Sequence, residues 1–489
     1  MMGFSRALAL LVATVGVLAL LGTPLAWAEN EKSVDEVRVE ATSSIKSMMP
    51  EEKAGDENSL FFRALVSAYE ENPTLKAARF QLQSVFETLP QAESGWRPTV
   101  AATAEVSGVH SDADPGDVST SNTSKDGAIA VIQPLYTGGQ TVAATAAAKN
   151  TVKAQIASLE SSEQQVLLAA VTSYMNLLRD ETLLKLSETN QTVIRRQKDA
   201  TGQRFKVGEL TRTDVSQAEA RLAAADAEVI TAGANLSSSR AAFEKVVGFL
   251  PDAALAFPAT RIDLPKSREE ALALAEKWNP NIRSSRHLFH AAQDGVRSTY
   301  GRLLPDVSIE AGVNKSYDPQ PGTYEESDGA SIGLVATIPL YEAGLVRSKV
   351  RQAKQTANQR YEQVAETGRS AREQVVSSWE NLKAAEAEIS ARKAQVEAAE
   401  VARFGVHQEA SLGSRTVLDT LDADQEVRDA QAALITARRN EVVARYTLAA
   451  ALGLLTPRNL GFAEKVPDYE KAIAAVRRNI LGTDVDSLR

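Results

Sequence analysis

Two carboxylates in the C-terminal part of the chain have a spacing that suits electrostatic chemistry. Asp419 and Asp422 are three residues apart, which places them on the same face of a helix. Repeated around an axis, such a pair would crowd several negative charges together, lower the local potential and favour cations. Solvated acids near the start of a helix have the same pattern, because acids are commonly found there. The spacing alone leaves both interpretations open.

Enzymatic chemistry has little support. Of the four histidines only His287 and His290 share a helix face, and no third metal ligand is evident near them. The absence of cysteine excludes a disulfide, a thiolate metal site and a thiol nucleophile. Phosphate-binding loops, nucleophile elbows and HExxH motifs are also absent. We therefore expect no enzyme, no metal and no cofactor, and the net charge of −9 argues mildly against nucleic acid as a partner.

The candidate residues lie within an internal duplication. Residues 72–248 and 279–453 carry the same landmarks in the same order, at an offset of 207 residues that becomes 205 after the first polar loop. The matched landmarks are Asn72-Pro73 and Asn279-Pro280, Pro134-Leu135-Tyr136 and Pro339-Leu340-Tyr341, Val207-Gly208 and Leu412-Gly413, and Asp214 and Asp419. Such a repeat predicts two copies of one structural module.

Each copy begins with a predicted helix, over 75–93 and 282–303, and then changes to alternation of apolar and polar residues. The alternating apolar residues of the second copy are Val307, Ile309, Ala311 and Val313, then Ala330, Ile332, Leu334, Ala336 and Ile338. Those of the first copy are Val100, Ala102, Ala104 and Val106, then Ala128, Ala130 and Ile132. This pattern predicts strand pairs with one apolar face. The polar segments 109–123 and 316–328 are expected to be exposed loops.

A very long stretch without proline follows each hairpin. The apolar residues of the two stretches share one spacing, at Leu159, Val166, Ala170, Tyr174, Leu177 and Leu184 and at Val364, Ala371, Val375, Trp379, Leu382 and Ile389. That spacing predicts a coiled-coil seam, and a helix from Gln140 to Phe205 would span roughly 100 Å. Each long helix should turn back at a glycine, Gly208 or Gly413, with a threonine after it to cap the returning helix.

The N-terminus has the pattern of a secretory signal peptide. A single charge, Arg6, precedes an apolar run that ends in the small-residue triplet Ala26-Trp27-Ala28, so we expect cleavage near Ala28. An uncleaved anchor is the alternative, although the run is short for a membrane span. The chain then divides into a signal peptide (1–28), a flexible acidic lead-in (29–58), a first repeat (59–248, hairpin 98–136, long helices 138–248), a linker (249–278), a second repeat (279–455, hairpin 305–341, long helices 343–453) and a C-terminal tail (456–489) with a short helix within 465–478.

These motifs resemble those of the TolC-like outer membrane channel proteins. The resemblance covers about residues 58–455 and is carried by Asn72-Pro73, Gly95-Trp96-Arg97-Pro98, Gln133-Pro134-Leu135-Tyr136 with Gly138-Gly139, Val207-Gly208 through Thr213-Asp214-Val215, and Gly413-Ser414-Arg415-Thr416 through Asp419 and Asp422. It implies a mainly α fold with a small transmembrane β part. In the implied homotrimer, four strands per chain complete a 12-stranded barrel in the outer membrane, and the long helices form a coiled-coil α-barrel across the periplasm.

The resemblance also implies a function. Such a channel is the exit duct of a tripartite efflux or type I secretion system, opened at its periplasmic end by an adaptor (membrane fusion) protein and an inner-membrane ABC or RND-type pump. A periplasmic coiled-coil rod or adaptor without a pore is the alternative, since long helices alone would fit it equally well. The two alternating hairpins favour the channel.

Residue-by-residue matching assigns the site. It gives Thr213, Asp214 and Arg415 to a gate network, Asp419 and Asp422 to a pore constriction, and Val207, Gly208, Leu412 and Gly413 to tips that contact the adaptor. The tip glycines also fit a simple role as helix C-caps. This chain has Ala410 where the family's best-studied member has a tyrosine, so one constraint on the gate is missing or comes from another residue.

The strands of the second copy are expected to separate lipid from lumen. The apolar set Ile309, Val313, Ile332, Leu334 and Ile338 should meet lipid, and the polar set Ser308, Glu310, Ser331 and Thr337 should line the lumen. Trp96, Tyr136 and Tyr341 stand at strand ends, where aromatic side chains lie at a membrane interface. Ordinary core packing is the alternative for these three.

Overall fold

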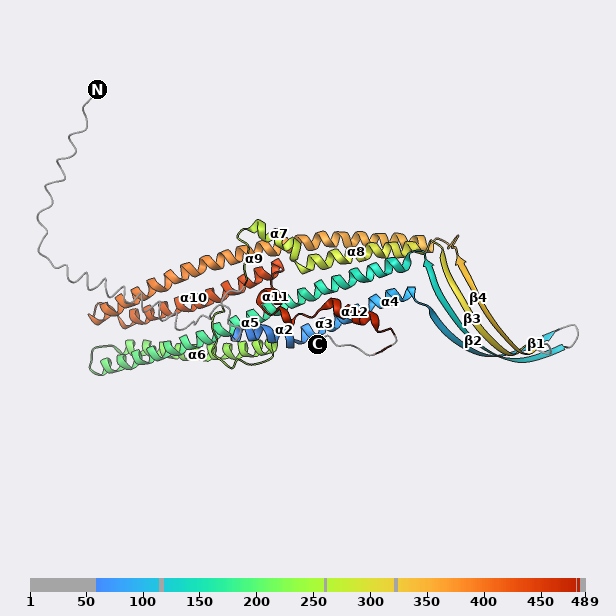
Figure 1. Cartoon of the computed structure of the whole chain (residues 1–489). Helices are drawn as coiled ribbons and strands as arrows, with labels where there is room; N and C mark the ends of the chain where they lie inside the picture. The colour runs from blue at the N-terminus through green and yellow to red at the C-terminus, as the bar shows by residue number, and fades with distance from the viewer. Residues whose placement is uncertain (1–58, 114–117, 259–261, 321–323, 481, 484–489) are drawn as a thin grey trace, which may run out of the picture.

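The computed structural model describes residues 59–113, 118–258, 262–320, 324–480 and 482–483, and the expected signal peptide and acidic lead-in lie outside them. The molecule is elongated, with long helices at one end and a curved sheet at the other (Figure 1). The helical elements are α2 (Leu60–Glu71), α3 (Pro73–Phe86), α4 (Thr88–Glu93), η1 (Ser94–Trp96), α5 (Gln140–Lys206), α6 (Arg212–Val247), α7 (Arg268–Trp278), α8 (Pro280–Gly301), α9 (Leu345–Ser411), α10 (Val417–Leu452), α11 (Pro457–Leu460), η2 (Ala463–Lys465) and α12 (Tyr469–Arg478). The strands are β1 (Thr99–Ala113), β2 (Val118–Thr137), β3 (Asp306–Gln320) and β4 (Tyr324–Thr337).

The long helices follow the predicted seams. Each of α5 and α9 is continuous over 67 residues, and each of the returning helices α6 and α10 has 36. Seam residues such as Leu159, Tyr174 and Val375 are buried. These seam residues are therefore packed between helices, which is how amphipathic helices of this length are stabilised. None of the described helices combines the length and apolarity that crossing a membrane requires.

Two expected boundaries differ from the structure. The range 249–278, expected to be a linker, contains α7, whose N-cap Ser267 accepts a hydrogen bond from the amide of Glu270. The helix expected over 75–93 is divided at Glu87 into α3 and α4. Pro90 explains the division, because its ring removes a backbone donor and disfavours a continuous helix through this point.

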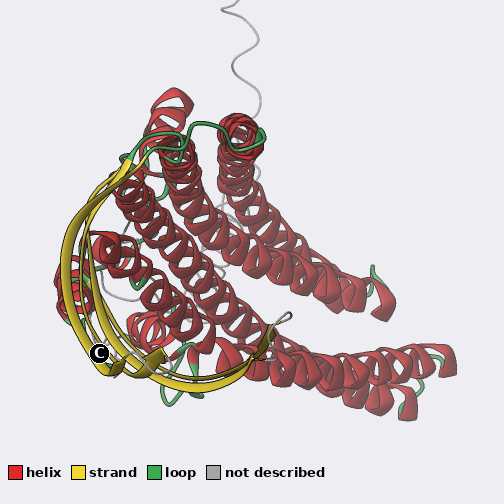
Figure 2. Ribbon diagram, turned by 90° about the vertical axis from the view of Figure 1, so that its right-hand side faces the viewer, coloured by secondary structure: helices red, strands yellow, loops and turns green. Residues whose placement is uncertain are grey.

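The two hairpins form one sheet. Its strands pair antiparallel in the order β1-β2-β3-β4, so β2 and β3 join the hairpins. The pairing runs through the segments 109–123 and 316–328, apart from 114–117 and 321–323, so these segments are strands and the expectation of loops there is wrong, although residues such as Val109 and Asp328 are exposed as expected. Polar residues can occupy these positions because the backbone alone supplies the ladder of hydrogen bonds. Figure 2 shows that the sheet curves strongly along its length.

The register corrects the predicted apolar face of the first copy. Val100 pairs with Val131, and Ala102 with Ile129, so these four residues share a face. That face continues through Val313 and Ala311, the partners of Ile129 and Val131 on β3. Ala128, Ala130 and Ile132 pair instead with Thr103, Ala101 and Thr99 on the opposite face. The prediction missed this because β2 carries apolar residues at both parities, and a shift of one residue exchanges the faces.

A buried polar cluster lies in the core near the middle of the molecule. Tyr69 on α2 donates a 3.0 Å hydrogen bond to Glu163 Oε1 on α5, and the Arg79 guanidinium lies over the Tyr69 ring. Burial raises the pKa of Glu163 to about 7. The tail helix α12 packs against the same core through Tyr469, which agrees with the short helix expected there.

Candidate gate at the helical tips

Each long helix turns back at a glycine, as predicted. Gly208 and Gly413 have φ of +83° and +79°, a region that L side chains rarely adopt. After each glycine the next amide closes the helix end, with Glu209 N–H donating to Arg204 O (2.9 Å) and Ser414 N–H donating to Glu409 O (3.1 Å). This is a glycine C-cap in both copies. Figure 1 shows both tips at the end of the molecule opposite the sheet.

The acids matched between the two copies form capping boxes. The carboxylate of Asp214 accepts hydrogen bonds from the Thr211 amide and hydroxyl, both at 2.8 Å, and Thr211 Oγ1 accepts from the Asp214 amide. Asp419 and Thr416 repeat this arrangement at the start of α10. Hydrogen bonds to the charged form lower the pKa of both carboxyl groups. Thr213 lies one residue before Asp214, in the first turn of α6.

The two tips carry internal ion pairs of opposite polarity. In the first tip the Arg204 guanidinium of α5 pairs with Glu209 beyond the glycine, at 3.0 Å. In the second tip Glu409 of α9 pairs with the Arg415 guanidinium beyond the glycine, at 2.7 Å. Within the chain Arg415 is therefore held by Glu409, and Asp214 by Thr211. An Asp214–Arg415 link needs a second chain or the release of these contacts.

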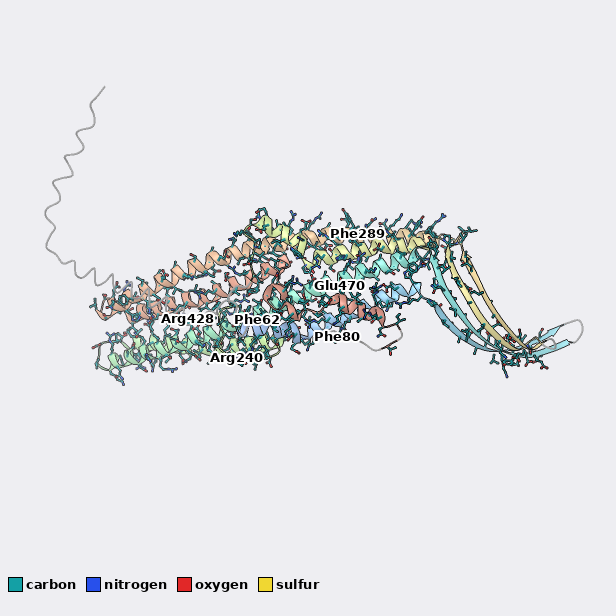
Figure 3. The ribbon with its side chains drawn as sticks, viewed as in Figure 1. Phe62, Phe80, Arg240, Phe289, Arg428 and Glu470 are labelled. Atoms are coloured by element: carbon teal, nitrogen blue, oxygen red, sulfur yellow. The ribbon has the colours of Figure 1, made fainter. Side chains whose placement is uncertain are left out.

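Two further ion pairs join the helical hairpins to each other. The Arg221 guanidinium on α6 pairs with Asp422 on α10, and Glu228 on α6 pairs with Arg428 on α10. Arg428 is labelled in Figure 3. The Arg428–Glu228 pair is the better shielded, with side chains 17% and 32% exposed. Arg428 also contacts Asp429 at 2.7 Å. Sequence reasoning missed these pairs because their members are about 200 residues apart and are not matched between the copies.

The described residues contain no group of three or more metal-ligating side chains. His287 and His290 lie on α8 as expected, and His290 contacts Gln293. Burial and the nearby cations Lys153 and Arg283 lower the pKa of His287. His407, near the second tip, pairs with Asp424 across α9 and α10 at 3.0 Å.

The fold defines a class of protein. The chain has paired helical hairpins of equal length at one end and a four-stranded antiparallel sheet at the other, and its fold is similar to that of the Campylobacter jejuni CmeC outer membrane channel. That solved structure matches with a TM-score of 0.72 and 17% identity over 86% of this chain and 89% of that one. The likeness establishes the architecture.

Sequence similarity establishes the family. The chain belongs to the outer membrane efflux protein family, whose model matches residues 64–248 and 271–454. It is 34% identical to the outer membrane efflux protein BepC of Brucella suis over 421 residues, 86% of this chain and 91% of that protein. It is 27% identical to the outer membrane protein TolC of Escherichia coli over 402 residues, 80% of this chain and 81% of that protein. The resemblance drawn from the sequence motifs is therefore confirmed.

Proposed function

We propose that three copies of the chain form an outer membrane channel that serves as the exit duct of a tripartite efflux or type I secretion system. The sheet carries this proposal. In the described part of the chain β1 and β4 pair on one side only, so each has a free edge. Open edges cannot persist in lipid, and pairing β4 of one copy with β1 of the next closes a 12-stranded barrel. The strong curvature of the sheet in Figure 2 suits this closure.

The two faces of the sheet support the proposal. Ile309 pairs with Leu334, and Val313 with Ala330, so the apolar residues of β3 and β4 line up on one face. Ile332 and Leu334 are 80% and 68% exposed in the single chain, which is unfavourable in water and favourable against lipid. Ser308, Glu310, Ser331 and Thr337 belong to the other register parity and face the lumen in the proposed barrel.

The long helices supply the periplasmic part of the duct. A helix of 67 residues spans about 100 Å, far more than a compact domain needs. In the trimer α5 and α9 form an α-barrel whose periplasmic entrance lies at the tips. The α-barrel only encloses the duct and hydrolyses no nucleotide in this proposal. The inner-membrane pump therefore supplies the energy for transport.

The entrance is held closed by side-chain pairs at the tips. We assign Thr213, Asp214 and Arg415 to a network between chains, and Asp419 and Asp422 to the constriction. The pairs Arg221–Asp422 and Glu228–Arg428 hold α6 against α10 and supply the constraint that Ala410 cannot. An adaptor that binds the open state more tightly shifts the equilibrium towards opening.

The tips also suit contact with the adaptor. Val207 and Leu412 are 72% and 84% exposed, and the space where Gly208 or Gly413 would carry a Cβ atom is empty. A helical hairpin of the partner can therefore approach the backbone closely. An ABC or RND-type pump in the inner membrane completes the assembly.

Expression in a Gram-negative host tests the proposal. We expect the protein in the outer membrane fraction, extractable in detergent as a heat-sensitive trimer that gives stepwise conductance in planar bilayers. Recovery as a soluble periplasmic protein without conductance would refute the channel and favour a coiled-coil rod.

A further inference from the structure

We propose that the first turns of α9 bind the anionic headgroups of phospholipids in the periplasmic leaflet of the outer membrane. The contact is made by Arg347, Arg351 and Lys354, here called the basic stripe. This inference rests on the proposed function, which places β3 and β4 in that membrane.

Within the part of the chain that the structure describes, the basic stripe has no partner that explains it. Its residues follow one another at intervals of four and three, so they share one face of α9, and all three are exposed. Among the described residues no ion pair or side-chain hydrogen bond involves any of them. The first turn of α9 has no acid, and the partial positive charge of a helix N-terminus disfavours cations there. The charges therefore do not stabilise the helix that carries them.

The first copy shows that the fold does not need these cations. The positions that match Arg347, Arg351 and Lys354 at the offset of 205 are Val142, Ala146 and Lys149. Helix α5 has the same length as α9 and begins without charge until Lys149. Two of the three cations are thus specific to the second copy.

The first copy also indicates that a neighbouring chain leaves Arg347 and Lys354 uncovered, whereas Ala146, which matches Arg351, is half-buried. Helix α5 is flanked on both sides, by α4 and α8, as α9 would be in a trimer. Even so, Val142 is 58% exposed and Lys149 is exposed. The matching positions, Arg347 and Lys354, therefore remain accessible when a second copy packs beside α9.

The stripe begins where the apolar surface ends. Leu340 and Tyr341, between β4 and α9, are 90% and 88% exposed, and Arg347 follows six residues after Tyr341, beyond the exposed Glu342 and in the first turn of α9. A band of apolar and aromatic side chains followed by cations is the pattern of a membrane interface, where lipid phosphates meet lysine and arginine. Arg347 lies about 3 Å along the helix axis from the start of α9, Arg351 about 9 Å and Lys354 about 14 Å. Since the surface potential decays within about 8 Å, the contribution should fall in that order.

The test measures lipid affinity of the intact trimer. Purified trimer in neutral detergent is titrated with phosphatidylglycerol or phosphatidylcholine, and bound lipid is counted by native mass spectrometry. The variant Arg347→Val with Arg351→Ala takes its residues from the first copy, so it should fold. At about fivefold per cation, we expect roughly 25-fold weaker phosphatidylglycerol binding, unchanged phosphatidylcholine binding, and a larger effect of Arg347→Val than of Lys354→Gln.

A matched control removes two cations elsewhere on the same helix. Lys393→Gln with Arg403→Gln changes exposed residues in the tip half of α9 and should leave phosphatidylglycerol binding at the wild-type value. Wild-type phosphatidylglycerol binding by Arg347→Val/Arg351→Ala would overturn the proposal. An equal loss of phosphatidylglycerol and phosphatidylcholine binding in that variant would also overturn it. Failure of both Arg347→Val/Arg351→Ala and Arg347→Gln/Arg351→Gln to trimerise would assign the stripe to contact between copies. The conductance of the wild-type protein tests the channel separately. If the wild-type protein forms a pore and the stripe variant binds phosphatidylglycerol as tightly as the wild type does, the lipid site is refuted and the channel is not.

Discussion

Reversing the charge of Arg428 should open the channel. Its guanidinium is 17% exposed and pairs with Glu228, which is 32% exposed, so the pair is only partly screened by water. Hydrogen bonds to charged groups in such settings are worth about 1.5–3 kcal/mol. Taking about 2 kcal/mol for each chain, three chains would hold the closed state by about 6 kcal/mol. A shift of about 5.5 kcal/mol converts a 1:99 equilibrium into 99:1.

The assay is conductance in planar bilayers without adaptor or pump. Arg428→Glu loses the pair and places two acids together, so we expect a larger single-channel conductance than that of the wild type. The charge swap Arg428→Glu with Glu228→Arg should return the conductance towards the wild-type value. The return should be incomplete because Asp429, which now pairs with Arg428, would face an acid.

The more exposed pair provides a graded comparison. Arg221 and Asp422 have side chains 38% and 54% exposed, and exposed pairs contribute only about 0.2–1 kcal/mol. Arg221→Glu should therefore raise the conductance less than Arg428→Glu. Wild-type conductance in Arg428→Glu, or a charge swap that behaves like the single variant, would refute the assignment of these pairs to the gate.

Three other predictions concern the pore, the tips and the core. Asp419→Ala with Asp422→Ala should weaken cation preference and block by polyvalent cations in planar bilayers; unchanged selectivity would remove both residues from the constriction. Replacing Gly208 or Gly413 with leucine should abolish export while the protein still trimerises, and normal export would leave the glycine a purely structural role. Burial keeps the pKa of Glu163 at about 7, above the ordinary value of 4.5, so its protonated form is favoured in the fold and stability falls as pH rises from about 4.5 to 7. In Glu163→Gln the loss of folding stability between these pH values should be smaller by up to about 3 kcal/mol, measured as a smaller difference in Tm between pH 5 and pH 8. An unchanged difference in Tm would show that Glu163 does not cause the loss of stability.

The long helices and their turns could be predicted because their signals are local. The seam through Tyr174 and Val375 repeats over many turns, and Gly208 and Gly413 mark the turns by a backbone requirement that no other residue meets as well. The faces of β3 were equally clear because only one parity is apolar. On β2 both parities carry small apolar residues, so the alternation alone does not distinguish one face from the other.

The contacts that hold the tips could be predicted only in part. Asp214 and Asp419 were selected by their place in the repeat, but their hydrogen bonds to Thr211 and Thr416 depend on where the returning helix begins, within one residue. The ion pair between Glu228 and Arg428 depends on the relative rotation of two helices from different copies. No local pattern encodes that rotation.

Equal helix lengths in the two copies restrict how this chain can change in evolution. Helices α5 and α9 have 67 residues each and α6 and α10 have 36, so both tips end at the same level. Deleting one residue from α5 alone would lower its tip by about 1.5 Å and rotate it by about 100°. Length changes should therefore be retained only as whole heptads, about 10 Å each, made in the ascending and returning helices of both copies. Homologous tunnels would differ in reach by such steps, with each step matched to the distance between the membranes that the assembly bridges.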